Sequence, residues 1–380
     1  MSSSNAGITA FPDSKSHYRI LDGLRGVAAI MVVIFHLFEA HATSNQDQVI
    51  NHGYMAVDFF YLLSGFVIGY AYDDRWHKMT LKGFFKRRLI RLHPMVVIGM
   101  IVGAIAFYFQ AGALWPGISQ VPVVKMLLVM LIGCTLLPVP LSMDIRGWQE
   151  MHPLNGPGWS LFFEYIANIL YAVFVRKFST KALSVLVFIT GVALVYLAVA
   201  GKNGDIIGGW SLEPEQLRIG FTRMMFPFFA GLLLSRISKP ANIKHAFGIC
   251  SIMVIIILAI PRIGGTQHLW LNGLYDAVCI IFLFPLIVYI GSSGALKGKY
   301  VPGIAKFLGD ISYPIYITHY PLIYTYTAWV ANNKIPLSKA YPVAILVLLS
   351  SIILAYACLK LYDEPVRKWL TKRYIATTTN

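Results

Sequence analysis

Arg25 and His36 lie eleven residues apart in an apolar stretch that begins at Ile20. If the stretch is one helix, eleven residues turn it by about 1100°, within about 20° of three full turns, so both side chains share a face about 16 Å apart. Ionisable groups are costly in hydrocarbon and usually face a cavity or a partner. An imidazole can act as a general base near neutral pH, and a guanidinium can bind an anion. The alternative is that Arg25 reaches the lipid headgroups and His36 is a hydrogen-bonded packing residue.

Other apolar segments also carry polar side chains that lipid alone would not accommodate. Asp58 lies in the second such segment, Glu164 in the fourth, and His319 in the ninth, between two prolines. We expect these three side chains to face a cavity. The prolines predict a kinked or broken helix, which is tolerated where it lines a cavity. Further candidates for substrate contacts, with packing as the alternative for the tyrosine, are Trp159, Ser160 and Tyr313.

A dense basic segment follows the second apolar segment. It runs from Asp73 to His93 and contains seven Lys and Arg. Arg88 and Arg91 are three residues apart, so they are neighbours on one face if the segment is helical. Guanidinium groups bind phosphate in a two-point geometry, so we expect these two arginines, with Arg87, to bind an anionic ligand. The other basic residues of the segment are expected to orient the chain and to touch anionic lipid.

The composition is typical of a polytopic membrane protein. Of the 380 residues 57% are hydrophobic and only 13% are charged, and the mean hydropathy is +0.64, which excludes an ordinary soluble protein. The formal charge of +15 does not indicate nucleic-acid binding, because the basic residues lie in short segments between apolar runs. The four cysteines lie in or beside apolar stretches without metal-ligand spacing, so neither a metal nor a disulfide is expected.

Applied to the basic segments between the apolar runs, the positive-inside rule predicts a membrane topology. We expect an all-α polytopic membrane protein of the inner membrane, with about ten transmembrane helices and both termini cytoplasmic. The apolar run 122–138 is then a re-entrant or peripheral helix. One membrane domain spans 20–370 between cytoplasmic tails at 1–19 and 371–380, and no signal peptide is expected to be cleaved. The expected crossings lie at about 20–36, 55–72, 95–111, 159–175, 181–200, 219–236, 246–261, 271–290, 307–330 and 341–361.

Six motifs, in order and at sensible spacing, give the chain a resemblance to a known family. The chain resembles membrane-bound acyltransferase family 3, whose bacterial O-acyltransferases modify lipopolysaccharide, exopolysaccharides, Nod factors and some macrolides. The resemblance covers about residues 18–370 and is to the form without an appended periplasmic hydrolase-like domain. The motifs are L-D-G-L-R-G followed by His36, G-Y-M-A-V-D-F-F-Y-L-L-S-G-F-V-I, K-R-R-L-I-R-L-H-P, W-S-L-F-F-E-Y, L-G-D-I-S-Y-P-I-Y-I-T-H-Y-P-L and Y-D-E-P-V-R-K-W.

The resemblance implies site residues. The family's arginine and histidine pair falls on Arg25 and His36, and its two-arginine motif falls on Arg88 and Arg91. The acids of two further motifs fall on Asp58 and Glu164. The chain departs from the family at His93, where the family often has tyrosine.

The implied reaction moves an acyl group, acetyl by default, from cytosolic acyl-CoA to a hydroxyl of a glycan or lipid-linked sugar. We expect His36 to be the base, with Asp58 or Glu164 orienting its imidazole; an acyl-histidine intermediate is the variant. Arg25 would hold the pantetheine end or polarise the thioester, beside the phosphate-binding arginines. The alternatives are a transporter or flippase for a lipid-linked glycan and, less favoured, a sensor of acyl-CoA. The acceptor, the acyl group and the oligomeric state are not specified by the sequence.

Overall fold

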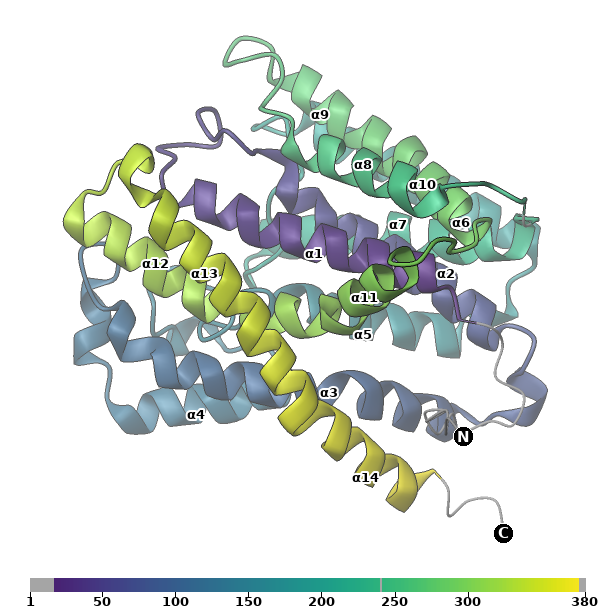
Figure 1. The fold of residues 1–380 in the computed structure, drawn as a ribbon, viewed down its shortest axis with the longest axis horizontal. Helices are drawn as coiled ribbons and strands as arrows, with labels where there is room; N and C mark the ends of the chain where they lie inside the picture. Colours follow the sequence, from purple (N-terminus) through teal and green to yellow (C-terminus); the bar gives the residue numbers. More distant parts are fainter. Residues whose placement is uncertain (1–16, 240, 376–380) are drawn as a thin grey trace.

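The computed structural model describes residues 17–239 and 241–375, which fold into helices without a β-strand (Figure 1). The α-helices are α1 Arg19–Glu39, α2 Ala56–Tyr72, α3 Leu81–Ala106, α4 Val123–Cys134, α5 Gly158–Val173, α6 Thr180–Ala200, α7 Pro214–Ile237, α8 Ala246–Ala259, α9 Leu269–Val278, α10 Phe284–Ser292, α11 Val301–Thr318, α12 Tyr320–Asn333, α13 Leu337–Cys358 and α14 Glu364–Tyr374. Short 3-10 helices are η1 His52–Met55, η2 Trp76–Lys78, η3 Phe107–Gln110, η4 Pro116–Gln120, η5 Leu141–Met143 and η6 Val175–Lys177. Two π-helical turns, η7 Cys279–Leu283 and η8 Leu359–Asp363, join α9 to α10 and α13 to α14.

The membrane character predicted from the sequence is confirmed. Within the described residues, 8 helical segments are long and apolar enough to cross a membrane, and each corresponds to an expected crossing. The other two expected crossings differ from a simple span. Helix α8 has only 14 residues, and the crossing expected at 307–330 is divided at His319 into α11 and α12, as its prolines predicted.

Helix α4 occupies the ambiguous run 122–138. It has 12 residues, which corresponds to a length of about 18 Å, and a hydrocarbon core is about 30 Å thick. A single α-helix of this length does not cross the bilayer, in agreement with the expected re-entrant or peripheral helix.

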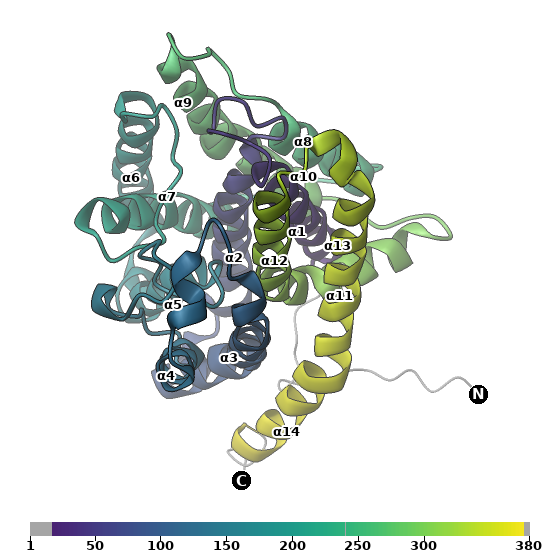
Figure 2. The same cartoon turned by 90° about the vertical axis from the view of Figure 1, so that its left-hand side faces the viewer.

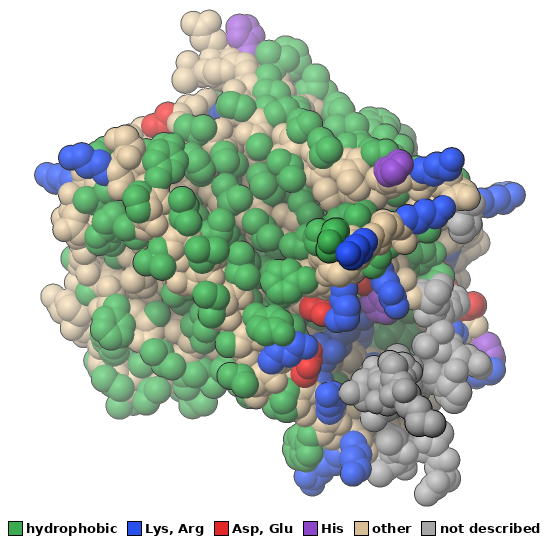
Figure 3. All heavy atoms as spheres, in the orientation of Figure 1, with side chains coloured by type: hydrophobic (Ala, Val, Ile, Leu, Met, Phe, Trp, Pro, Cys, Tyr) green, Lys and Arg blue, Asp and Glu red, His purple; other side chains and the backbone are tan. Residues whose placement is uncertain are grey.

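The surface of the bundle is apolar around its middle. Hydrophobic side chains cover most of the face drawn in Figure 3, and Lys and Arg gather mainly towards its right-hand side. Large apolar side chains are openly exposed on helices at the periphery, for example Phe188 of α6 at 72% and Ile353 of α13 at 69%. Contiguous apolar surface of this kind is stable in lipid and not in water.

Helix α1 lies near the centre of the bundle, beside α2 and α11 (Figures 1 and 2). Glycines let these helices approach closely. A Cβ added at Gly26 of α1 would lie 2.2 Å from the carbonyl oxygen of Leu308 in α11, and one added at Gly65 of α2 would lie 1.8 Å from the carbonyl oxygen of Phe228 in α7. Small residues of this kind allow backbone contact between membrane helices, so the glycine of L-D-G-L-R-G that follows Arg25 has a packing role.

The expected cytoplasmic tails lie partly outside the described residues. Positions 1–16 and 376–380 are not described, so the expectation for them is not addressed. Helix α14 extends to Tyr374, so the beginning of the expected C-terminal tail is helical.

Candidate active site

Two cavities lie at opposite ends of α1. The first, called the basic cavity, has a volume of about 850 Å3 and is lined by both ends of the described chain, His17 and Ile375. The second, called the aromatic cavity, has a volume of about 610 Å3 and is lined by the last turns of α1. Lys and Arg on the described wall of the basic cavity are Arg19, Arg25, Arg87, Arg88, Arg91, Lys306 and Arg367. Rings on the described wall of the aromatic cavity include His36, Trp115, Trp148, Trp159, Trp210, Tyr320 and Tyr324.

The two cavities share lining residues. Among the described residues, Val57 of α2 and Tyr316 of α11 line both cavities. The Tyr316 hydroxyl lies 2.7 Å from Oγ of Ser160 in α5, and its ring packs edge-on against Phe60 of α2 with centroids 5.2 Å apart. These four residues, from three helices, are called the wall below.

His36 faces the aromatic cavity from the last turns of α1. Helix α1 is continuous from Arg19 to Glu39, so Arg25 and His36 lie on one helix, as predicted. Nδ1 of His36 lies 2.6 Å from Oε2 of Glu39. A carboxylate only accepts hydrogen bonds, so we assign the proton to Nδ1, which leaves the lone pair on Nε2. The His36 ring also stacks on that of His319, with centroids 5.7 Å apart. The imidazole is held in the form that a general base requires.

The orienting acid predicted from the sequence is wrong. Neither Asp58 nor Glu164 is the bonding partner of His36, whose nearest carboxylate belongs to Glu39 on its own helix. Asp58 is fully buried and is bound at 2.7 and 3.3 Å by the guanidinium of Arg223 in α7. The physical reason is that a buried carboxylate needs a fully desolvated counter-ion, which a guanidinium supplies and a neutral imidazole does not.

For the acyl transfer expected from the motif resemblance, we predict that Glu39→Ala lowers kcat by roughly tenfold or more, because the imidazole loses the group that fixes its tautomer. KM for the expected acyl-CoA donor should stay unchanged, since Glu39 does not line the basic cavity, where the anion-binding arginines are expected. Initial rates of the purified protein at varied acyl-CoA measure both constants. Glu213→Ala, at an exposed glutamate before α7, is the matched control. A kcat of Glu39→Ala within twofold of the control would contradict the role of this carboxylate.

The expected anion-binding residues converge in the basic cavity. Helix α3 contains Arg87, Arg88 and Arg91, and all three line this cavity together with Arg25 of α1. Arg88 is only 7% exposed, and its Nη2 lies 3.2 Å from Oε1 of Glu164.

Glu164 therefore lines the basic cavity beside Arg88 and is not the partner of His36. Its Oε1 also accepts a hydrogen bond of 2.7 Å from Ser64. Arg25 has an acid of its own, since its Nη1 lies 3.3 Å from Oδ1 of Asp22. Paired acids keep several of the arginines fixed in place, which suits recognition of a polyanion without an excess of mobile charge.

The four expected substrate-contact residues fall in three different places. Trp159 lines the aromatic cavity, whereas Ser160 and Tyr313 line the basic cavity. His319 is fully buried and lines neither cavity. Its Nδ1 lies 2.9 Å from the carbonyl oxygen of Ile315, and its ring stacks on that of His36, so neither cavity supports the substrate contact expected of His319.

The segment before α5 positions Trp159 and Ser160. Asn155, just before Gly156-Pro157-Gly158, donates a hydrogen bond of 2.8 Å to the carbonyl oxygen of Ile317 in α11. The first turn of α5 is thereby tied to α11, close to Tyr316. This connection explains why residues far apart in the sequence form one wall.

A buried carboxylate also lines the aromatic cavity. Both oxygens of Glu150 accept from the Tyr324 hydroxyl at 2.7 Å, and Arg146 lies 3.6 Å away. Glu150 belongs to the connection between α4 and α5, outside the spanning helices, and burial raises its pKa to about 7. A carboxyl group with this pKa can donate or accept a hydrogen bond near neutral pH, as recognition of a hydroxyl requires.

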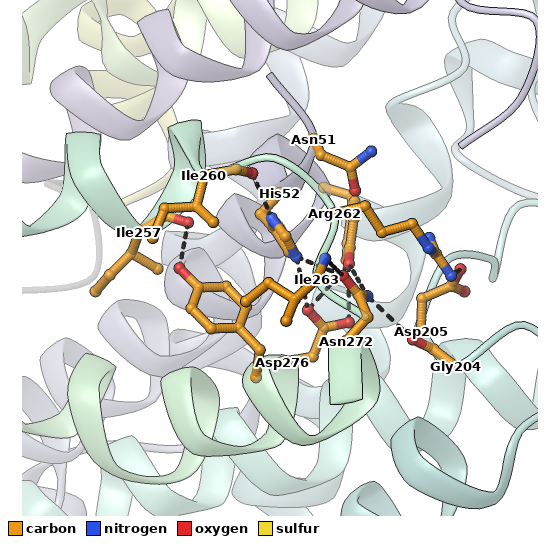
Figure 4. Close-up of polar contacts among 12 residues, drawn as sticks. Asn51, His52, Gly204, Asp205, Ile257, Ile260, Arg262, Ile263, Asn272 and Asp276 are labelled. Atoms are coloured by element: carbon orange, nitrogen blue, oxygen red, sulfur yellow. Dashed lines mark hydrogen bonds and ion pairs between the residues drawn. The ribbon is translucent and has the colours of Figure 1, made fainter. Parts of the chain in front are cut away.

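A further polar network supports the aromatic cavity from behind (Figure 4). Tyr54, which lines this cavity, donates a hydrogen bond of 2.9 Å to Asp276 of α9. His52 lies 3.0 Å from Asn272 of the same helix, and Arg262 pairs with Asp205 at 2.9 Å. Asp276, Asn272 and His52 are fully buried, so this network fixes α9 against η1, the 3-10 helix that precedes α2.

Sequence reasoning missed several residues that the structure places at the site. Arg223 carried a signal, because it is a cation inside an expected crossing and meets the same criterion that selected Asp58. Glu39 carried a weaker signal, since it follows His36 by three residues, one turn of helix. Glu150 and Tyr316 carried no decisive signal: the first lies in a connection, and tyrosines pack in many helices.

These features define a polytopic helical membrane protein in which a basic cavity and an aromatic cavity meet beside a histidine. The chain belongs to acyltransferase family 3, whose model, described as an acyltransferase domain, matches residues 18–360. The family predicted from the motifs is therefore confirmed, and the protein is a membrane acyltransferase.

Individual relatives agree with this family. Protein 2 in the picA locus of Rhizobium radiobacter is 31% identical over 186 residues, which are 47% of this chain and 93% of that protein. O-acetyltransferase OatA of Staphylococcus aureus is 25% identical over 381 residues, 92% of this chain and 57% of OatA. A putative O-acetyltransferase of the same species is 24% identical over 83% of this chain and 52% of its own length. The chain thus spans about half the length of these two staphylococcal relatives, and no solved structure gives a significant match.

Proposed function

We propose that the protein transfers an acyl group, acetyl by default, from acyl-CoA to a hydroxyl of a sugar acceptor, with His36 as general base. The observation that carries the proposal is the meeting of two chemically different cavities at the wall, one lined by arginines and the other by His36 and indole rings. A transferase that joins two dissimilar substrates needs two such sites with one point of contact.

The basic cavity suits the donor. CoA carries several phosphate charges, and guanidinium groups bind phosphate through paired hydrogen bonds. Arg87, Arg88 and Arg91 lie on α3 along this cavity, and Arg25 lines it from α1. A thioester chain bound by these arginines would extend towards the wall. We propose that this cavity opens to the cytosol, as the basic segments predict for the inner membrane.

The aromatic cavity suits a glycan or lipid-linked sugar. Four indole rings offer flat apolar faces against which the C–H faces of a sugar can pack, and their N–H groups can donate to hydroxyls. Glu39 and Glu150 also line it, and its arginine, Arg223, is already bonded to Asp58. A hydroxyl-rich acceptor finds hydrogen-bonding partners here.

The reaction follows from these positions. Nε2 of His36 removes the proton of the acceptor hydroxyl as the oxygen attacks the thioester carbonyl. The C–O bond forms, the C–S bond breaks, and the thiolate of CoA takes the proton from the imidazolium. The Glu39 carboxylate stabilises that imidazolium through Nδ1.

The test is transfer from acetyl-CoA labelled in the acetyl group, with the purified protein in detergent and no ion gradient. Mass spectrometry of glycans from cells with and without the gene identifies the acceptor by loss of one acyl mass increment. Turnover of the label supports the enzyme. Binding of acetyl-CoA without turnover would instead identify a sensor, and no consumption with gradient-dependent movement of a glycan would identify a transporter.

We predict that Arg91→Ala raises KM for acetyl-CoA about tenfold or more with little change in kcat, because it removes a charge-assisted contact to a phosphate. Arg91 is exposed within the basic cavity, so the substitution leaves no buried partner behind. Lys78→Ala, at an exposed lysine of the same basic segment outside the cavity, is the control. Equal KM values for the two variants would place the donor elsewhere.

A further inference from the structure

We propose that the Tyr316 hydroxyl is a catalytic group that stabilises the negative charge on the thioester carbonyl oxygen during transfer. This inference rests on the proposed function. It concerns a residue that neither the motif resemblance nor the comparison with relatives assigns.

The bond between acyl group and acceptor can form only where both substrates reach. Arg25 lines only the basic cavity, and His36 lines only the aromatic cavity. Direct transfer brings the thioester carbon and the acceptor oxygen within about 3–3.5 Å of each other. The two substrates can approach in this way only where the cavities adjoin, and in the described chain the residues that line both are Val57 and Tyr316.

Among the wall residues, Tyr316 can donate a hydrogen bond to a carbonyl oxygen. The side chain of Val57 has no polar atom. Oγ of Ser160 lies 2.9 Å from the carbonyl oxygen of Pro157, to which it donates its proton. Since a serine hydroxyl has one proton, the Tyr316 hydroxyl must be the donor in its 2.7 Å bond to Ser160. Tyr316 thus presents a hydrogen-bond donor at the place where the charge develops.

The Tyr316 side chain is held rigidly. Tyr316 is only 6% exposed, and its ring packs edge-on against Phe60. Tyr61 donates a hydrogen bond of 2.9 Å to the carbonyl oxygen of Ser160 and so fixes the residue that holds Tyr316. A small rotation of the phenol can exchange Ser160 for a substrate oxygen, so the donor is preorganised and little reorganisation is needed.

The bond changes balance with this assignment. As His36 takes the hydroxyl proton, the acceptor oxygen bonds to the thioester carbon and the carbonyl oxygen becomes an oxyanion. The Tyr316 hydroxyl donates a hydrogen bond to this oxyanion without giving up its proton. Collapse of the intermediate restores the C=O bond and expels the CoA thiolate, which takes the proton from His36.

The experiment compares Tyr316→Phe with Tyr108→Phe in the intact protein. Both substitutions delete one phenol hydroxyl, but Tyr108 lines neither cavity, and its hydroxyl donates a hydrogen bond of 2.9 Å to the carbonyl oxygen of Val121. We expect Tyr316→Phe to lower kcat about a hundredfold with KM for acetyl-CoA unchanged, the usual size of effect for one oxyanion donor. Tyr108→Phe should keep kcat within a few-fold of the unaltered protein.

Melting temperatures in detergent confirm that both variants fold. Tyr316→Phe with a normal melting temperature and an unaltered kcat would overturn the inference, as would an equal fall in both variants. Either result leaves the proposed function standing, because that is judged by turnover of acetyl-CoA in the unaltered protein.

Discussion

His36→Ala is expected to lower the rate of acyl transfer about a thousandfold, while acetyl-CoA still binds. The reason is that the Nε2 lone pair of His36 is the base of the proposed reaction, and general bases contribute about 10²- to 10⁴-fold. Donor binding should persist because His36 lies outside the basic cavity. Turnover of labelled acetyl-CoA gives the rate, and calorimetric titration with CoA gives the affinity.

The control for this substitution is His77→Ala, at an exposed histidine between α2 and α3. It removes the same side chain without touching either cavity and should leave the rate unchanged. If His36→Ala kept more than a tenth of the activity of this control, His36 would not be the base.

Asp58→Ala is expected to destabilise the protein by about 3–5 kcal/mol, because it leaves the Arg223 guanidinium buried without its counter-ion. Asp58 is fully buried, and Arg223 is only 2% exposed, so water can compensate for little of the lost ion pair. Arg223→Ala should cost a similar amount for the reciprocal reason. Thermal unfolding in detergent, followed by intrinsic fluorescence, measures both changes.

Two control variants separate this effect from general damage. The double substitution Asp58→Leu with Arg223→Met removes both charges at once and should recover much of the lost stability. Asp310→Ala breaks the exposed pair with Lys306 and should cost no more than about 1 kcal/mol. A double variant as unstable as Asp58→Ala would show that packing, and not the stranded charge, causes the loss.

Features that belong to a single helix could be predicted from the sequence. The spacing of Arg25 and His36 is periodic within one helix, and α1 carries both as expected. The break near His319 coincides with Pro321, which lies in the first turn of α12, where proline is tolerated, whereas Pro314 lies inside α11.

Contacts between helices could not be predicted in the same way. Asp58 had several possible partners, and its choice of Arg223, 165 residues later, depends on α2 packing against α7 through Gly65. The wall poses the same difficulty, because Val57, Ser160 and Tyr316 come together only when three separate helices are assembled. A single sequence provides residue types and periods, but not which faces pack together.

The shared wall has an electrical consequence. Were the aromatic cavity open to the outer side, opposite the cytosolic opening proposed for the basic cavity, aqueous ions would enter both, and the membrane voltage would fall mainly across the layer at Val57 and Tyr316. A unit charge that crosses the full voltage gains or loses about 2.3 kcal/mol per 100 mV. The proton that follows the acyl group from acceptor to thiolate would therefore move through most of this field, so the energised state of the cell would act directly on the rate of modification.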